Sequence, residues 1–463
     1  MTSRATSTNA GSGAQRSVRP LWLVFLAFLG PMLLSNVLQA LSGTVNNVFV
    51  GQILGTHALA AVASVFPIVF FLISLVIGIG AGASVLIGQA WGAHETHKVK
   101  AIAGTALALG LALGVAIALL GGTFTEEMLR LLRTPPSVLP EAIGYARLMM
   151  FAMPGLLVFI LATQLMRGVG DTITPLFALL ISTAVSCVLT PAFILGWGGL
   201  PRLGVTSAAA ASICAFVVAL CFMAWYMRRK SHPLAPDGEL LRALRIDPKL
   251  LRLVIKIGLP TGMQVIVMSL SEIVLLSLVN GFGADATAAY GAVNQVVNYV
   301  QFPAISIAIT ASILGAQAIG AGHANGLGAI TRTGLQMNIV MTGGLVVLGY
   351  LLSRLLIGAF ITSAPVVELA QSLLHIMLWS SVVYGCAAVL SGVMRASGAV
   401  LVPTGISIFC IAAIELPAAY ALAGHFGLKG VWMAYPIAFV AMLALQAAYY
   451  LLFWRKRKIV RLV

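Results

Sequence analysis

No Asp, Glu, Lys or Arg occurs between Pro20 and Ala93. A stretch of this length without a charged side chain cannot cover the surface of a water-soluble domain, in which about 25% of the residues are charged. The rest of the chain has the same character, because 60% of its 463 residues are hydrophobic and only 8% are charged. We therefore predict an integral membrane protein.

The apolar segments are long and continuous, which predicts membrane-spanning helices. In the hydrocarbon layer every backbone amide needs an internal partner, so a chain crosses as helices of about 20 apolar residues or as a closed barrel. A barrel would show alternating segments of about ten residues, and this chain does not. We predict an all-α protein with twelve spans, at 21–50, 58–86, 99–122, 139–165, 173–196, 204–227, 253–281, 287–318, 328–352, 367–393, 402–424 and 428–454.

Lys and Arg are distributed unequally between the two sides of this bundle. If both termini are cytoplasmic, all but six of the 27 Lys and Arg residues lie on the inner side. The outer six are Arg130, Arg133, Arg147, Arg202, Arg354 and Lys429. Because cytoplasmic loops carry an excess of these residues, we predict a multi-pass protein of the plasma (inner) membrane with both termini cytoplasmic.

One long polar stretch near the middle of the chain separates two sets of six spans. It holds Glu239–Leu253, a short amphipathic segment that we expect to lie at the inner membrane surface. The predicted organisation is a disordered cytoplasmic tail (1–20), an N-lobe (21–227), a cytoplasmic linker (228–252), a C-lobe (253–454) and a basic cytoplasmic tail (455–463).

The two sets of spans repeat each other at a shift of about 228 residues. Gly88-Gln89 corresponds to Ala316-Gln317, and Met166-Arg167-Gly168 corresponds to Met394-Arg395-Ala396. Six is an even number, so both sets enter the membrane in the same sense and their pseudo-twofold axis follows the membrane normal. Two such bundles around a shared cavity are typical of a transporter. A channel is the weaker alternative, because rocking halves serve alternating access better than a permanent pore.

These motifs resemble those of the multidrug and toxic compound extrusion (MATE) transporters. The resemblance covers nearly all of residues 20–454 and depends on Asn46–Gly51 with Leu59–Ala61, Gly88–Ala93, Met166–Asp171 with Pro175, and their second-half counterparts. It implies two six-helix lobes arranged as a V. It also implies export of amphipathic, often cationic drugs or metabolites in exchange for H⁺ or Na⁺.

Two carboxylates lie inside predicted spans, Glu272 in the seventh and Glu415 in the eleventh. A charge at the bilayer centre costs a few kcal/mol or more, so such residues are functional candidates. Each follows a proline by twelve residues, which places both at a similar depth. Asn294, Asn298 and His375 fall at the same level. We predict a polar layer in the C-lobe that binds the coupling ion and the substrate.

Exchange follows if a proton and a substrate compete for the same buried negative charge. With only two buried acids, the sequence favours H⁺ over Na⁺, which is better served by several oxygen ligands including charged ones. The alternative is that Glu272 and Glu415 accept hydrogen bonds from neighbouring helices and only fix the packing. For His375 too, the alternative is a hydrogen-bonded residue that only contributes to packing.

The first lobe departs from the family pattern. Many relatives carry an Asp at the position of Asn46, and polar residues that are frequent in their fifth span fall on Ser186 and Thr190. Asn46, Ser186 and Thr190 predict a neutral polar site, with hydrogen bonding between helices as the alternative. Tyr384 stands where the NorM-like branch has an Asp. Its ring is a candidate to line a cavity and attract organic cations, with packing in the core or against lipid as the alternative.

Arg167 and Arg395 occupy equivalent inner positions in the repeat. We expect them to anchor the turns at the ends of their helices, with a role in gating as the alternative. Gly78, Gly80 and Gly82 predict a close approach between the second span and a neighbouring helix.

Several other functions are disfavoured. The sequence contains no P-loop motif and no evident nucleophile–base pair, so neither an ATP-driven pump nor an enzyme is predicted. The five cysteines form no CxxC pair, which predicts neither a disulfide framework nor a zinc site. The basic residues interrupt apolar runs instead of forming one face, which disfavours nucleic-acid binding.

The predicted partners are a small amphipathic substrate and membrane lipids, and the chain is expected to be a monomer without a cofactor other than its coupling ion. The nearest rival function is a flippase or exporter of a lipid-linked or other endogenous metabolite in the same superfamily. That rival predicts a strongly basic central cavity, and the spans contain almost no buried Lys or Arg.

Overall fold

A computed structural model of the protein describes residues 20–131, 134–361 and 363–463. In these ranges eleven helices are long and apolar enough to cross a membrane. A twelfth span is the pair Ala364–Met377 (α12) and Ser380–Ala396 (α13), which is bent by 40°. Except for Pro20, the predicted N-terminal tail at 1–20 lies outside the described residues.

The first lobe contains six long helices. They are α1 (Leu21–Phe49), α2 (Thr56–Gly92), α3 (Thr96–Leu131), α4 (Leu139–Val169), α5 (Ile173–Leu195) and α6 (Ser207–Arg229). A π-helical turn, Val50–Leu54, extends α1. Several of these helices are longer than predicted, because the apolar run marks the hydrocarbon layer and the helical hydrogen bonding continues beyond it.

The second lobe repeats this plan with more interruptions. Its helices are α8 (Pro248–Asn280), α9 (Ala284–Gly320), α10 (Leu327–Leu351), α11 (Ser353–Gly358), α12, α13, α14 (Leu401–Phe409), α15 (Leu416–Phe426) and α16 (Leu428–Leu452). A π-helical segment, Cys410–Glu415, joins α14 to α15 in the eleventh span. Gly55 (φ 91°) and Gly283 (φ 104°) form equivalent turns in the two lobes, in a backbone region that favours glycine.

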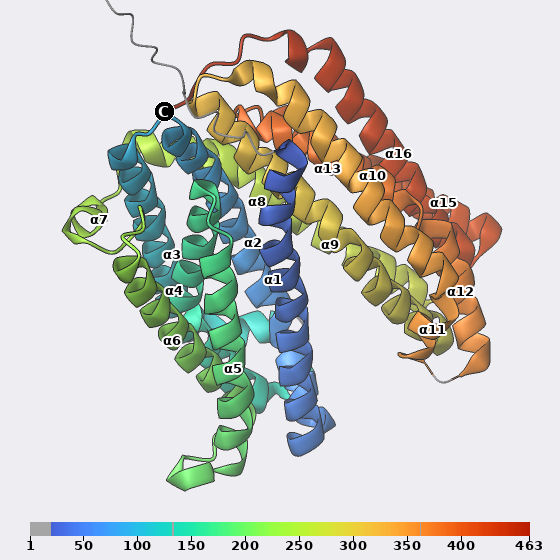
Figure 1. The fold of residues 1–463 in the computed structure, drawn as a ribbon. Coiled ribbons are helices and arrows are strands. Elements are labelled where there is room, and N and C mark those ends of the chain that lie inside the picture. Colours follow the sequence, from blue (N-terminus) through green and yellow to red (C-terminus); the bar gives the residue numbers. More distant parts are fainter. Residues whose placement is uncertain (1–19, 132–133, 362) are drawn as a thin grey trace, which may run out of the picture.

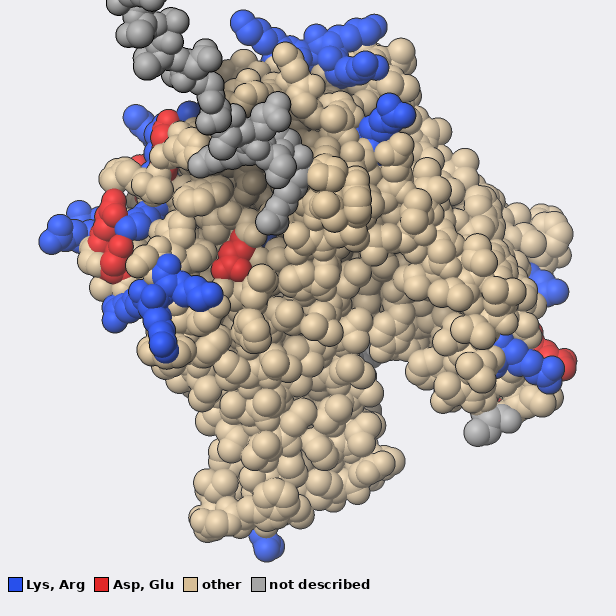
Figure 2. All heavy atoms as spheres, viewed as in Figure 1, with Lys and Arg blue, Asp and Glu red and all other residues tan. Residues whose placement is uncertain are grey.

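Figure 1 shows the two bundles joined at the end that carries α7 (Gly238–Ala243) and the C-terminus, and diverging toward the opposite end. The two-lobed, V-shaped, all-α fold predicted from the sequence is confirmed. In Figure 2 a hollow separates the lobes at the open end, while most of the visible Lys and Arg side chains gather at the joined end.

Glycines allow α2 of the first lobe to cross α8 of the second at very short range. A Cβ on Gly78 would overlap the backbone of Gly262, and a Cβ on Gly82 would lie 2.8 Å from the Gly258 nitrogen. The close approach predicted from the glycines of the second span is therefore confirmed for Gly78 and Gly82, and its partner is the seventh span.

At the joined end, α2 also crosses α9, and the repeat is visible in individual contacts. The Gln89 side chain donates to the Ala396 carbonyl at 2.8 Å, and the Gln317 side chain donates to the Gly168 carbonyl at 3.0 Å. Each bond runs from one lobe to the other. These two contacts are related by the shift of 228 residues, so they obey the pseudo-twofold symmetry. We call this pair of contacts the interlobe gate.

The gate also depends on glycine and is covered by the C-terminal tail. A Cβ on Gly92 would overlap the Gln317 carbonyl, and one on Gly320 would overlap the Gln89 carbonyl. From the tail, the Leu462 amide donates to Gln89 Oε1 at 2.8 Å, and an Arg461 guanidinium nitrogen lies 2.5 Å from Glu95 Oε1. The tail thus stabilises the gate in its closed arrangement.

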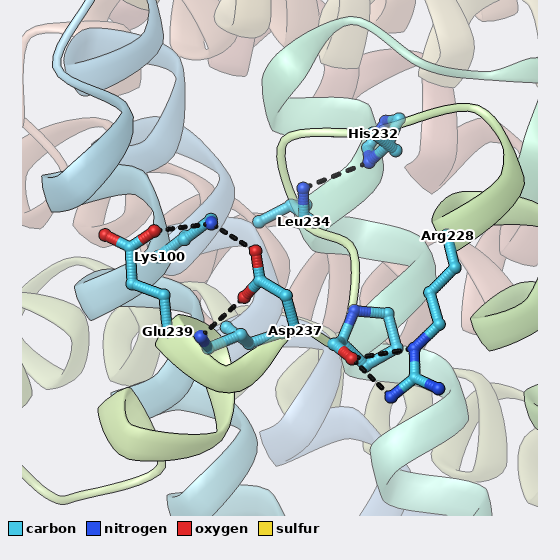
Figure 3. Close-up of polar contacts among 8 residues, drawn as sticks. Lys100, Arg228, His232, Leu234, Asp237 and Glu239 are labelled. Atoms are coloured by element: carbon cyan, nitrogen blue, oxygen red, sulfur yellow. Dashed lines mark hydrogen bonds and ion pairs between the residues drawn. The ribbon is translucent and has the colours of Figure 1, made fainter.

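The linker is held against the first lobe by a charged cluster (Figure 3). Lys100 Nζ on α3 lies 2.5 Å from Asp237 Oδ2 and 2.6 Å from Glu239 Oε2. Asp237 also caps α7 by accepting from the Leu240 amide at 2.9 Å. Arg228, at the end of α6, donates two hydrogen bonds to the Pro236 carbonyl.

The amphipathic segment predicted at Glu239–Leu253 is wrong in extent. Helix α7 ends at Ala243, and α8 already begins at Pro248, inside the predicted linker. Asp247 caps α8 by accepting from the Lys249 amide at 2.8 Å, and Pro248 cannot continue a preceding helix.

We predict that Gly92→Ala or Gly320→Ala prevents full closure of the interlobe gate, because each added methyl overlaps backbone of the other lobe. Spin labels at Thr96 and Asn325, in a background without native cysteines, should report a longer interlobe distance by double electron–electron resonance. Gly328→Ala, where an added Cβ meets nothing within 4 Å, is the matched control. An unchanged distance in Gly92→Ala would contradict this role.

We also predict that Lys100→Met releases α7. Hydrogen bonds from Lys100 and Leu240 lower the pKa of Asp237 below its usual 3.8. This contact therefore stabilises the linker above that pKa and is lost only as the pH falls through the lowered value. The anisotropy of a dye at Leu241→Cys should stay high from pH 7 to 5 in the parent and be low throughout in Lys100→Met. Lys98→Met, which removes a more exposed pair with Glu95, should behave like the parent.

Candidate functional site

The C-lobe encloses a cavity of about 70 Å³ between α8, α9, the bent pair α12 and α13, the π-helical segment of the eleventh span, and α16. It contains five of the side chains predicted to form the polar layer or the cavity wall: Glu272, Asn294, Asn298, Tyr384 and Glu415. The structure thus brings together residues that are far apart in the sequence. It also adds Gln264, Gln301 and Tyr435, which the sequence analysis missed.

Helical periodicity explains this convergence. Gln264, Met268 and Glu272 lie one turn apart on one face of α8. On α9, Asn294, Asn298 and Gln301 follow the spacing i, i+4 and i+7, which also defines one face. The missed Gln264 and Gln301 could have been found from this spacing. Tyr435 had no comparable signal, because it is an isolated polar residue on α16.

The two carboxylates have different surroundings. Glu415 is only 4% exposed and its Oε1 accepts a hydrogen bond of 2.9 Å from Ser271. Glu272, the residue next to Ser271 on α8, is exposed and lines the same cavity. Glu415 ends the π-helical segment of the eleventh span, and such segments are frequent at functional sites.

Other polar groups line this cavity, and the hydrogen-bonding capacity of one of them is unused. Gln264 Oε1 is buried and has no hydrogen-bond partner among the described residues. The hydroxyls of Tyr290 and Tyr435 lie 3.3 Å apart, and the Tyr384 ring packs on Phe439 with centroids 5.0 Å apart. The cavity has room for water or a small ion, since one water needs about 10–15 Å³. It is smaller than the pockets of about 300–1,000 Å³ that hold drug-sized ligands.

His375 does not join this layer. Its Nε2 lies 3.1 Å from Ser353 Oγ, and the Tyr350 hydroxyl donates to its carbonyl at 2.9 Å. Met377, two residues later on α12, lines the cavity instead. Two residues correspond to about 200° of helix rotation, so His375 faces away. The depth of the residue was estimated from the sequence, but the direction of its side chain was not, and its predicted place in the polar layer is wrong.

In the first lobe, Asn46, Ser186 and Thr190 do lie together. The Asn46 side chain donates to Ser186 Oγ at 3.2 Å and accepts from Thr190 Oγ1 at 3.1 Å. Ser186 and Thr190 are buried, and these bonds join α1 to α5. This geometry agrees with the alternative of hydrogen bonding between helices.

A second cavity, of about 320 Å³, lies in the first lobe beside this cluster and was not predicted. None of the described residues that line it is Asp or Glu. Its polar side chains come from three helices and are Ser35, Asn36, Gln39, Ser42, Thr163, Gln164, Arg167, Ser182 and Thr183. The residues of α1 follow a helical stripe that the sequence analysis could have recognised. Arg167 lines this cavity with its side chain, while the adjacent Gly168 carbonyl accepts the gate bond from Gln317.

The described residues contain no group of three or more His, Cys, Asp or Glu arranged to hold a metal ion. The two carboxylates of the C-lobe are the acidic groups of its cavity, and its remaining oxygens come from amides and phenols. This set can bind a proton, or a monovalent cation with the help of water.

Comparison with known proteins gives consistent matches along the whole chain. The MatE family model matches residues 31–192 and 260–421, once in each lobe. The chain is 42% identical to the probable multidrug resistance protein YoeA of Bacillus subtilis, over 97% of this chain and 98% of that protein. It is 23% identical to the multidrug export protein MepA of Staphylococcus aureus (strain MSSA476), with 94% of each chain covered.

Solved structures show the same fold at lower identity. A mutant of the Vibrio cholerae MATE transporter VcmN superposes with a TM-score of 0.86 at 21% identity, covering 94% of this chain and 98% of that one. An outward-facing multidrug resistance MATE transporter of the MOP superfamily gives a TM-score of 0.84 at 22% identity, covering 92% and 94%. The two matched segments, the relative of 42% identity and the two-lobed fold agree, and the chain belongs to the MatE family of MATE transporters.

Proposed function

We propose that this protein is a H⁺-coupled antiporter that exports amphipathic compounds, cationic drugs and metabolites among them, across the inner membrane. The observation that carries the proposal is the pair Glu272 and Glu415 in one small cavity inside the C-lobe. The multidrug resistance and export named for YoeA and MepA support the substrate class.

The two carboxylates suit proton coupling because one is open to the cavity and the other is enclosed. An ionised carboxylate in an apolar interior is costly, and binding of a proton removes its charge. The hydrogen bond from Ser271 lets Glu415 remain in place in either protonation state. A conformational change of the lobe then follows proton binding or release, which links the ion to the export cycle.

The V shape supports alternating access. The hollow between the lobes is open at the end opposite the gate (Figures 1 and 2), so this arrangement is outward-facing if the basic end is cytoplasmic. The concentration of Lys and Arg at the joined end supports that orientation, with both termini inside. Opening of the gate bonds of Gln89 and Gln317 would expose the hollow to the cytoplasm.

We predict that Glu415→Gln and Glu272→Gln each abolish uphill export of ethidium from proteoliposomes driven by a pH gradient. Both variants keep the shape and hydrogen-bonding capacity of the side chain but remove the titrating group. Glu368→Gln, which changes an exposed carboxylate on α12 of the same lobe, should transport like the parent. Full uphill transport by either cavity variant would rule out the assigned role of that residue.

The identity of the coupling ion is tested by imposing one gradient at a time. An outside-acid pH gradient without sodium should drive ethidium export, and a sodium gradient at equal pH on both sides should not. The reverse result would replace H⁺ by Na⁺ and leave the antiport proposal standing. Transport that dissipates the ethidium gradient under both conditions would indicate a channel.

A further inference from the structure

The first-lobe cavity is large enough for a drug-sized ligand, and the proposed coupling chemistry does not use it. Its volume of about 320 Å³ falls in the range of about 300–1,000 Å³ typical of small-molecule sites. The C-lobe cavity is several times smaller. The passenger and the coupling ion therefore have separate candidate sites of different size.

The charge of the first-lobe cavity comes from Arg167. A guanidinium offers five N–H donors, and the hydrogen bond found for this one is a long contact of 3.4 Å with Gln164 Oε1. In the described part of the chain no carboxylate pairs with it. Asp171, four residues later, is engaged elsewhere, because its Oδ1 accepts from the Ile173 and Thr174 amides and its Oδ2 faces His232 at 3.4 Å.

The rest of the wall combines neutral polar groups with an aromatic surface. Thr183 Oγ1 is buried at the cavity and has no hydrogen-bond partner within residues 20–131, 134–361 and 363–463. Phe159 and Phe216 both line the cavity, and their ring centroids are 5.6 Å apart. An aromatic body can pack on these rings while an acidic group reaches the guanidinium, which matches carboxylates in a bidentate geometry.

We propose that the first-lobe cavity binds amphipathic aromatic compounds through a carboxylate held by Arg167. The inference rests on the proposed export function and adds to its cationic substrates a class held at this cavity, the aromatic acids and zwitterions. The repeat makes this site specific to one lobe, because the equivalent Arg395 does not line the C-lobe cavity.

The test is equilibrium binding of three naphthalene probes to the full-length protein in phosphatidylcholine nanodiscs, without any ion gradient. The probes share one aromatic body and carry a carboxylate (2-naphthylacetate), a hydroxyl (2-naphthylethanol) or a quaternary ammonium (2-naphthylmethyl-trimethylammonium). The parent should bind 2-naphthylacetate about tenfold or more tightly than 2-naphthylethanol. Preference for the ammonium probe, or equal affinity for all three, would overturn the proposal.

Variants test whether Arg167 causes the preference for 2-naphthylacetate over 2-naphthylethanol. Arg167→Gln should lose the tenfold preference while still binding 2-naphthylethanol, which shows that the cavity is intact. Arg167→Lys should retain part of the preference, because it keeps the charge and loses the bidentate geometry. Arg395→Gln, the repeat-matched control, should bind like the parent. An unchanged preference in Arg167→Gln contradicts the assignment.

Two further arms separate this proposal from its alternatives. Glu415→Gln should bind 2-naphthylacetate normally even though it fails in proton-driven export. Binding without a gradient therefore tests the first-lobe site independently of the proton-coupling proposal. If replacing phosphatidylcholine with phosphatidylglycerol abolishes 2-naphthylacetate binding and leaves 2-naphthylethanol binding unchanged, the guanidinium binds the anionic headgroup of that lipid and the proposal is overturned.

Discussion

The contact of the two lobes at one end determines what the rest of the molecule can do. Gln89 and Gln317 each bridge to a backbone carbonyl of the opposite lobe, and Gly92 and Gly320 leave no space for a side chain at the crossing. A contact made of a few hydrogen bonds and close backbone packing is strong when complete and is lost with a small separation. The lobes can therefore separate at this joint when these few contacts break.

Sequence duplication explains the symmetry of the joint but not the chemistry of the lobes. The two gate bonds are related by the repeat, whereas the cavities differ in volume, in charge and in the helices that line them. Glu272 and Glu415 line the cavity of the second lobe, and Arg167 lines the cavity of the first. Each lobe can carry one of the two exchanged species, because only the joint must remain equivalent in both halves.

The sequence predicted the number of spans, the repeat and the family because these depend on hydrophobicity and residue spacing along the chain. It also found Glu272, Glu415, Asn294 and Asn298, since a polar residue in an apolar span is conspicuous. It failed for His375 because depth alone does not give the direction of a side chain. It missed Arg167 as a cavity residue because that arginine lies near a helix end, where a basic residue usually anchors the helix at the membrane surface.

The placement of Arg167 connects the proposed passenger site to the joint. Its side chain lines the first-lobe cavity, and the carbonyl of the next residue, Gly168, accepts the hydrogen bond from Gln317 of the other lobe. A ligand that binds the guanidinium therefore acts on the end of α4, which also contributes a carbonyl to the gate. Energetic coupling between sites requires a structural element with two arrangements that both sites influence. The end of α4 has the contacts required of such an element, because the cavity and the opposite lobe meet there within two consecutive residues.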